Sequence, residues 1–88
     1  MYLIVFTKKA NKDKALLKQA GLETKAKRLL NLISENPFSN PPEYEKLSGE
    51  LKGCYSRRIN IRHRLVYEVF EQEQTVRILS MWSHSEDN

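Results

Sequence analysis

The sequence predicts an α+β domain in which a helical hairpin packs on a largely antiparallel sheet. An apolar stretch of β type opens the chain, two helical segments follow it, and three further β-type stretches occupy the second half. Elements in the order β-α-α-β-β-β, with the helices grouped together, are typical of this class. The length of 88 residues suits one small domain, so we expect residues 1–88 to form a single domain.

The first part of the chain predicts one strand and two helices. Residues 2–6 are an unbroken apolar run with β-branched and aromatic members, which is typical of a strand covered on both faces. Thr7 can cap a helix over residues 8–20, which are rich in Lys, Ala and Leu. Residues 22–35 form the second helix, because their apolar members recur at helical spacing, and Pro37 ends it. The apolar members are Leu22, Ala26, Leu29, Leu30 and Ile33.

The remainder predicts a loop and three strands. Residues 36–50 hold three prolines and a glycine, so we expect an irregular loop, and so long a loop in a small domain is often functional. Residues 51–61 and 63–70 indicate the two strands of a hairpin whose turn lies near residues 60–62. Residues 75–82 form the last strand.

Strand alternation predicts which side chains share a face. In the hairpin, one face is expected to carry Tyr55, Arg57, Ile59 and Ile61, opposite Ser56, Arg58 and Asn60. In the last strand, the expected faces are Val76, Ile78 and Trp82 on one side and Arg77, Leu79 and Met81 on the other. The predicted sheet therefore carries guanidinium groups among its apolar residues.

Charge and cysteine content limit the classes of function. A net charge of +4 and a sequence pI near 9.3 are compatible with an RNA or acidic-protein partner without requiring one. The single cysteine, Cys54, excludes an intrachain disulfide and a cysteine-based metal cluster; it suits a reducing cytoplasm, and we expect it to pack as a small hydrophobe. No apolar run approaches about twenty residues, so we expect no membrane span. The apolar start is too short, and lacks the preceding basic residues, to be a signal peptide.

Metal ions and nucleotide cofactors are not expected. Two histidines and dispersed aspartates show no metal-ligand spacing, and no glycine-rich phosphate loop is present. The stretch from Tyr55 to Tyr67 instead holds four arginines, whose planar guanidinium groups match phosphate oxygens. We therefore expect an anionic substrate.

Cleavage of RNA without a metal needs few groups. A base takes the proton of the ribose 2′-hydroxyl, a cation stabilises the phosphorane-like transition state, and an acid protonates the departing 5′-oxygen. The candidates for these parts are Glu45, Arg58, Arg64 and His84. They would form a site if the loop and the C-terminal end met over the sheet. Each also has a plain alternative as a surface, loop or tail residue, and the residue types alone leave both interpretations open.

Five short segments carry a resemblance to a known family. They are Asn36-Pro37-Phe38, Glu45-Lys46-Leu47-Ser48-Gly49, Tyr55-Ser56-Arg57-Arg58-Ile59, His63-Arg64-Leu65-Val66-Tyr67 and Met81-Trp82-Ser83-His84. At this spacing the chain resembles the YoeB/Txe branch of the RelE-like toxins of bacterial type II toxin–antitoxin systems. The resemblance covers somewhat over half the chain by motif and all of it by element order.

The resemblance implies a ribosome-dependent mRNA endoribonuclease that cuts in the A site and leaves a 2′,3′-cyclic phosphate and a 5′-hydroxyl. By position, Glu45 resembles the family's general base, Arg64 its transition-state arginine and His84 its general acid. Arg58 resembles a second phosphate-binding arginine. Lys46 is a weaker match, because the family's loop lysine falls near Ser48 here, although Lys46 could supply a similar charge.

The implied partners are a cognate antitoxin, the ribosome with its mRNA, and operator DNA only through the antitoxin complex. No membrane is implied, no cofactor is needed, and a homodimer is compatible with the family.

One departure from the family pattern bears on function. The family usually ends His-Tyr, whereas Ser85 follows His84 here, so the aromatic face that could stack on a base is lost. Trp82 or Tyr55 could replace it, although both suit a core equally well. The alternative function is a RelE-like binding module with weak or no catalysis that acts through antitoxin and operator complexes. Poisoning of gyrase by a related fold is less expected, because the Glu, Arg and His set is retained.

Overall fold

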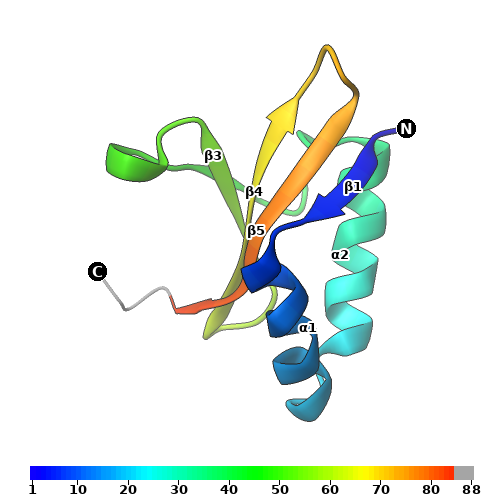
Figure 1. Ribbon diagram of the computed structural model, residues 1–88, viewed down its shortest axis with the longest axis vertical. Helices are drawn as coiled ribbons and strands as arrows, with labels where there is room; N and C mark the ends of the chain where they lie inside the picture. The colour runs from blue at the N-terminus through cyan, green and yellow to red at the C-terminus, as the bar shows by residue number, and fades with distance from the viewer. Residues whose placement is uncertain (85–88) are drawn as a thin grey trace.

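The computed structural model describes residues 1–84 and the side chains of residues 1–82, and it confirms the α+β class. Its elements are β1 (Leu3–Phe6), α1 (Lys8–Gln19), α2 (Glu23–Glu35), β2 (Glu45–Lys46), the short 3-10 helix η1 (Gly49–Leu51), β3 (Cys54–Arg58), β4 (His63–Phe70) and β5 (Thr75–His84). Figure 1 shows the two helices side by side against one face of the sheet, with β3 on the side away from them.

The five strands form one sheet in the order β1-β5-β4-β3-β2. The first strand pairs in parallel with the last, and every other pairing is antiparallel. The prediction that the first strand is covered on both faces is wrong, because β1 is an edge strand and Leu3 is 64% exposed. An edge strand under two helices needs apolar residues chiefly on its inner face.

The middle segment is more regular than expected. Glu45–Lys46 forms a two-residue strand that pairs with Ser56 and Tyr55 of β3, and Gly49–Leu51 forms η1. Pro42 is the last proline of this segment, so the residues after it have the backbone N–H groups that strand pairing needs. The hairpin strand correspondingly begins at Cys54 rather than at residue 51.

The predicted turn of the hairpin is confirmed. The Asn60 side-chain oxygen accepts hydrogen bonds from the backbone N–H groups of Arg62 and His63, at 2.9 and 2.8 Å. This is the turn chemistry that asparagine favours. Ile61 lies in the turn, outside β3, and is 78% exposed, so the expectation that it shares a strand face with Tyr55 is wrong.

The pairing of β4 with β5 contains two successive register shifts, which together form a bulged stretch of β5 that changes one expected face. The partners step from Arg64↔Ser83 to Val66↔Ser80 and then to Tyr67↔Ile78. Additional residues in one strand of a pair redirect its side chains. Met81 therefore joins the buried core that contains Val76 and Ile78, and its assignment to the opposite face is wrong.

The core lies between the helices and the sheet. Its members are Ala10, Leu17, Leu22, Ala26, Leu29 and Ile33 from the helical part, Leu65, Tyr67, Val76, Ile78 and Met81 from the sheet, and Ile59 from the turn after β3. The Thr7 hydroxyl caps α1 by accepting a bond from the Ala10 N–H at 3.1 Å, as predicted. Within residues 1–84, no helix is both long and apolar enough to cross a membrane.

Cys54 is buried, as expected for a small packed residue. Burial is the main cause that raises the pKa of its thiol, and the nearby Glu68 carboxylate adds to it. A thiol with a raised pKa stays protonated and is a poor nucleophile.

Candidate functional site

Three consecutive residues of β3 alternate between the two faces of the sheet. Alternation along the strand turns Arg57 toward the core face, where it is almost fully buried. Ser56 and Arg58 point the opposite way, to the face that the helices leave uncovered. Arg64 of β4 pairs directly with Arg58, and it therefore joins the same uncovered face.

An open hollow of about 360 Å³ lies on this face, lined by Pro42, Glu43, Glu45, Ser56, Arg58 and Arg64. Its residues come from the proline-rich segment, from β2, and from the adjacent strands β3 and β4. We call it the arginine hollow. Two carboxylates and two guanidinium groups line it, so the formal charges of its lining side chains cancel.

Arg64 is held between two partners. Its Nη1 lies 3.2 Å from Glu45 Oε1 and donates a hydrogen bond to Ser56 Oγ at 3.0 Å. The Arg64 side chain is 17% exposed, the Glu45 side chain is 64% exposed, and Ser56 is buried. The arginine is thus the fixed member of the site and the carboxylate is the accessible one.

This arrangement suits phosphate chemistry. A planar guanidinium group binds phosphate oxygens in a defined orientation, and Arg58 adds a second positive charge on the same side. A carboxylate within reach of both can accept a proton from a group that the arginines hold. Among the described side chains, no three His, Cys, Asp or Glu residues converge as a metal site would require.

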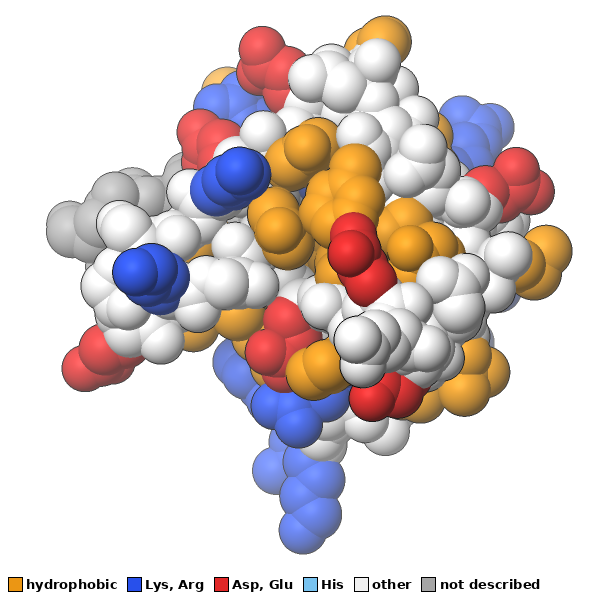
Figure 2. Space-filling view, turned by 90° about the horizontal axis from the view of Figure 1, so that it is seen from above, with side chains coloured by type: hydrophobic (Ala, Val, Ile, Leu, Met, Phe, Trp, Pro, Cys, Tyr) orange, Lys and Arg blue, Asp and Glu red, His pale blue; other side chains and the backbone are white. Residues whose placement is uncertain are grey.

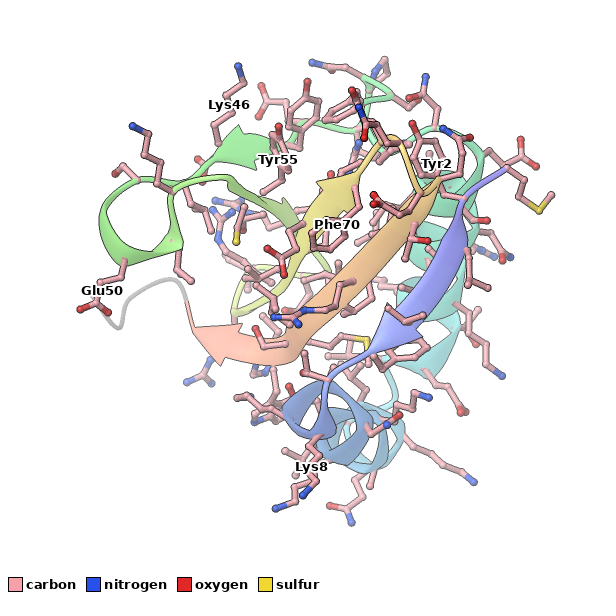
Figure 3. All side chains as sticks on the ribbon, turned by 45° about the horizontal axis from the view of Figure 1, so that its top comes forward. Tyr2, Lys8, Lys46, Glu50, Tyr55 and Phe70 are labelled. Carbon is pink, nitrogen blue, oxygen red and sulfur yellow. The ribbon has the colours of Figure 1, made fainter. Side chains whose placement is uncertain are left out.

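The structure brings together three of the five predicted site residues: Glu45, Arg58 and Arg64. Lys46 is apart from them, because it pairs with Tyr55 and so faces away from Ser56. Figure 3 shows the Lys46 side chain pointing away from the sheet. It does not line the arginine hollow.

For His84 the structure describes the backbone and not the side chain. Residue 84 ends β5 opposite His63, and residue 83 pairs with Arg64, so the last strand runs directly beside the arginine before it ends. The His84 side chain and Ser85, the departure from the family pattern, lie outside the described part of the chain.

The aromatic residues considered for stacking lie elsewhere. Tyr55 packs against Phe38 and Tyr44, with ring centroids 5.3 and 5.7 Å apart. Trp82 stacks on His63 at 3.8 Å. None of these rings lines the arginine hollow, and His63 is buried, so it is poorly placed to exchange protons there.

The sequence interpretation missed three features of the hollow. Alternation already placed Ser56 beside Arg58, but it could not show that the hydroxyl holds Arg64. Pro42 and Glu43 form a wall of the hollow, which no local pattern indicates because their place depends on how the segment before β2 folds back.

Comparisons with known proteins point to one family and to one fold. The family model described as the YoeB-like toxin of bacterial type II toxin–antitoxin systems matches residues 6–85. A toxin named YoeB from Mycobacterium bovis is 47% identical over 49 residues. That match spans 56% of this chain and 58% of the relative, a little over half of each.

Solved structures match over nearly the whole chain. A YoeB/ParE toxin from Agrobacterium tumefaciens has a TM-score of 0.84 at 27% identity, and the match covers 93% of this chain and 98% of that one. The toxin in a YoeB–YefM complex from Staphylococcus aureus has a TM-score of 0.80 at 34% identity, with 96% and 98% covered. The same toxin is also known as a dimer, with a TM-score of 0.79 at 35% identity over 94% of this chain and 97% of that one.

Proposed function

Because this chain belongs to the YoeB-like toxins of bacterial type II toxin–antitoxin systems, we propose that it is an endoribonuclease that cuts mRNA in the ribosomal A site. One observation carries the proposal: Arg64 is fixed between Glu45 and Ser56 in a hollow that also holds Arg58. Cations placed where a phosphate can enter, with a carboxylate beside them, are the parts that metal-free RNA cleavage needs.

The reaction is an internal transfer at phosphorus. Glu45 accepts the proton of the ribose 2′-hydroxyl, and the 2′-oxygen forms a bond to the adjacent phosphorus. Arg64 and Arg58 stabilise the negative charge of the phosphorane-like transition state. The bond to the 5′-oxygen breaks as His84 donates a proton to it, which leaves a 2′,3′-cyclic phosphate and a 5′-hydroxyl.

The Glu45–Arg64 ion pair can be exchanged for an ion pair between Arg64 and a substrate phosphate. An incoming phosphate takes over the guanidinium group from the carboxylate, which frees Glu45 to act as a base. A pair with an exposed carboxylate is weak, so this exchange costs little. The ribosome supplies the bent mRNA that brings the 2′-hydroxyl to the carboxylate, and ribosome dependence follows from that need.

His84 is proposed as the acid from its place at the end of β5, which pairs beside Arg64. Imidazole exchanges protons near neutral pH more readily than any other side chain. Lys46, which points away from the hollow, is proposed only as a peripheral contact that attracts the RNA backbone.

The proposed partners follow from the family. The relative from Staphylococcus aureus is known in complex with YefM and as a dimer, so we propose a cognate antitoxin and a homodimer for this chain. Operator DNA is reached only through the antitoxin complex. Because the proposed substrate is mRNA on the ribosome, we propose a cytoplasmic location.

One surface suits such a protein partner. Figure 2, which looks onto the end of the sheet where β4 turns into β5, shows apolar side chains gathered in the middle with charged side chains around them. Phe70, the last residue of β4, is 40% exposed. Exposed apolar clusters of this kind mark protein interaction sites.

The experiment is a cleavage assay with purified 70S ribosomes, a defined mRNA and a tRNA in the P site. Arg64→Ala and His84→Gln are each expected to lower the cleavage rate by about 100-fold or more. Arg77→Ala is the matched control, because that arginine pairs with Glu68 outside the hollow, and it should cleave as the wild type does. Unchanged cleavage in both of the first two variants refutes the assignment.

A second candidate function is supported by Ser85, which stands where the family has tyrosine. A chain that lost its base-stacking group would act as a binding module in antitoxin and operator complexes, with weak or no cleavage. Expression without an antitoxin separates the two functions: arrested growth with loss of mRNA supports the nuclease, whereas normal growth with correctly folded protein supports the binding module.

A further inference from the structure

Among the described side chains, Arg57 is the largest that is fully buried, with 1% of its surface exposed. Its guanidinium group donates in three directions. Nε donates to Tyr67 Oη at 2.9 Å and Nη1 to the Pro42 carbonyl at 2.7 Å, while Nη2 donates to the carbonyls of Pro37 and Ser39 at 3.0 and 2.8 Å. Three backbone carbonyls of one segment therefore accept hydrogen bonds from one side chain.

All of these partners are neutral oxygen atoms. A buried charge must be stabilised by hydrogen bonds if it has no ion pair, so the guanidinium group and the carbonyls depend on each other. Tyr67 Oη completes the arrangement by donating to the Pro37 carbonyl at 2.8 Å. The Tyr44 ring adds a cation–π contact, with its centroid 5.0 Å from Arg57 Cζ.

The segment that Arg57 holds makes one short turn of its own, in which the Ser39 N–H donates to the Asn36 carbonyl at 3.1 Å and the Phe38 N–H donates to Asn36 Oδ1 at 3.0 Å. Pro37, Pro41 and Pro42 carry no backbone N–H, so this stretch cannot form a continuous strand ladder. The same segment leads directly to Pro42 and Glu43, which form one wall of the arginine hollow, and then to Glu45.

We propose that Arg57 is a positioning residue that holds residues 37–42 in place and so aligns Glu43 and Glu45 against Arg58 and Arg64. The consequence for cleavage rests on the proposed function, whereas the fixing of the segment does not. Lysine cannot replace this arginine, because a single ammonium group lacks the fork that reaches three separate carbonyls. Two adjacent arginines of β3 thus have different roles. Arg57 positions the wall of the arginine hollow from the core side, and Arg58 contacts the bound phosphate.

The first test is amide hydrogen exchange in Arg57→Lys. Amides of residues 38–46 should exchange about tenfold faster or more, while those of α2 and β4 keep their wild-type rates, since loss of local contacts opens only the segment they hold. Arg77→Lys is the matched control, because it makes the same substitution at an arginine remote from this segment. Tyr67→Phe, which removes one hydroxyl and keeps the ring, is the second variant should Arg57→Lys fold poorly, and it should shift the same amides in the same direction.

The second test separates binding from chemistry in the ribosome cleavage assay. If Glu45 is displaced, the base is misaligned with the 2′-hydroxyl while the surface that contacts RNA stays the same. In Arg57→Lys, kcat should therefore fall by about tenfold, with KM changed less than about threefold. Arg77→Lys should leave both parameters unchanged.

The possible results are distinguishable. Unchanged exchange in residues 38–46 of both Arg57→Lys and Tyr67→Phe overturns the proposal, whatever the cleavage rate. Faster exchange with wild-type kcat shows that the segment is held but does not position the site, which also overturns the proposal. If the wild type itself fails to cut RNA and exchange still rises, the proposed function fails while the role of Arg57 in holding the segment stands.

Discussion

The buried carboxylate of Asp13 offers a sharp test of how the end of β5 is placed. Asp13 lies on α1 and is 3% exposed. Its Oδ2 accepts a hydrogen bond from the backbone N–H of Met81 at 2.9 Å, within the bulged part of β5, and both of its oxygens contact Lys9 Nζ. The strand that carries Ser83 beside Arg64 is therefore tied to the first helix.

The expected cost of Asp13→Ala can be built from these contacts. A buried N–H left without an acceptor costs about 1–3 kcal/mol, and the pair with the largely exposed Lys9 adds about 0–1 kcal/mol. The higher helix propensity of alanine offsets about 0.5 kcal/mol. The free energy of unfolding should fall by about 2 kcal/mol, which lowers the Tm of a domain this small by roughly 8–16 °C.

Urea and thermal unfolding followed by circular dichroism measure this cost. Asp13→Asn is the control, because its amide oxygen still accepts from Met81 and only the charge toward Lys9 is lost; it should cost less than about 1 kcal/mol. Hydrogen exchange at the Met81 amide should accelerate in Asp13→Ala and stay slow in Asp13→Asn. Equal destabilisation by the two substitutions, or an unchanged Met81 amide in Asp13→Ala, would refute this account.

Three further predictions concern the arginine hollow and its support. Ser56→Ala removes the hydroxyl that holds Arg64; a bond worth about 1 kcal/mol should lower single-turnover cleavage about fivefold, whereas Thr75→Ala, at the remote β4–β5 turn, should have no effect. Glu45→Gln should leave Tm within a few degrees, because the Glu45 carboxylate of the ion pair is 64% exposed, yet lower cleavage by about 100-fold or more. Burial is the main cause that raises the pKa of Tyr67, so its protonated form favours the folded state. The stability that this raised pKa contributes is complete below the ordinary tyrosine pKa of about 10, and it is lost as pH rises through the higher pKa of the folded state. In urea titrations between about pH 9.5 and 11, the free energy of unfolding of Tyr67→Phe should therefore fall less than that of the wild type.

The sequence alone determined most of the helices and strands and named the candidate site residues. The spacing of apolar residues over 22–35, the stop at Pro37 and the turn at Asn60 are all local, and each is found where it was predicted. The segments that resemble the toxin family also named Glu45, Arg58 and Arg64, which the fold brings to one hollow. Local propensity suffices for the helix, its stop and the turn, because these features depend on neighbouring residues only.

Tertiary structure decided what the alternating patterns could not. The parallel pairing of β1 with β5 joins residues some seventy positions apart, and this pairing made the first strand an edge. The bulge in β5 changed the face of Met81, because a register depends on the partner strand as well as on the strand's own sequence. No period of the sequence records where an additional residue will be accommodated.

The clearest case is the pair Arg57 and Arg58, which are chemically identical and adjacent. Alternation shows that they face opposite ways, but only the fold shows that one faces a core supplied with carbonyls and the other an open hollow. A buried guanidinium group is stable only where oxygen atoms from distant segments converge on it. That convergence depends on chain packing, so only the tertiary structure shows that Arg57 lies among carbonyls in the core and Arg58 at the open hollow.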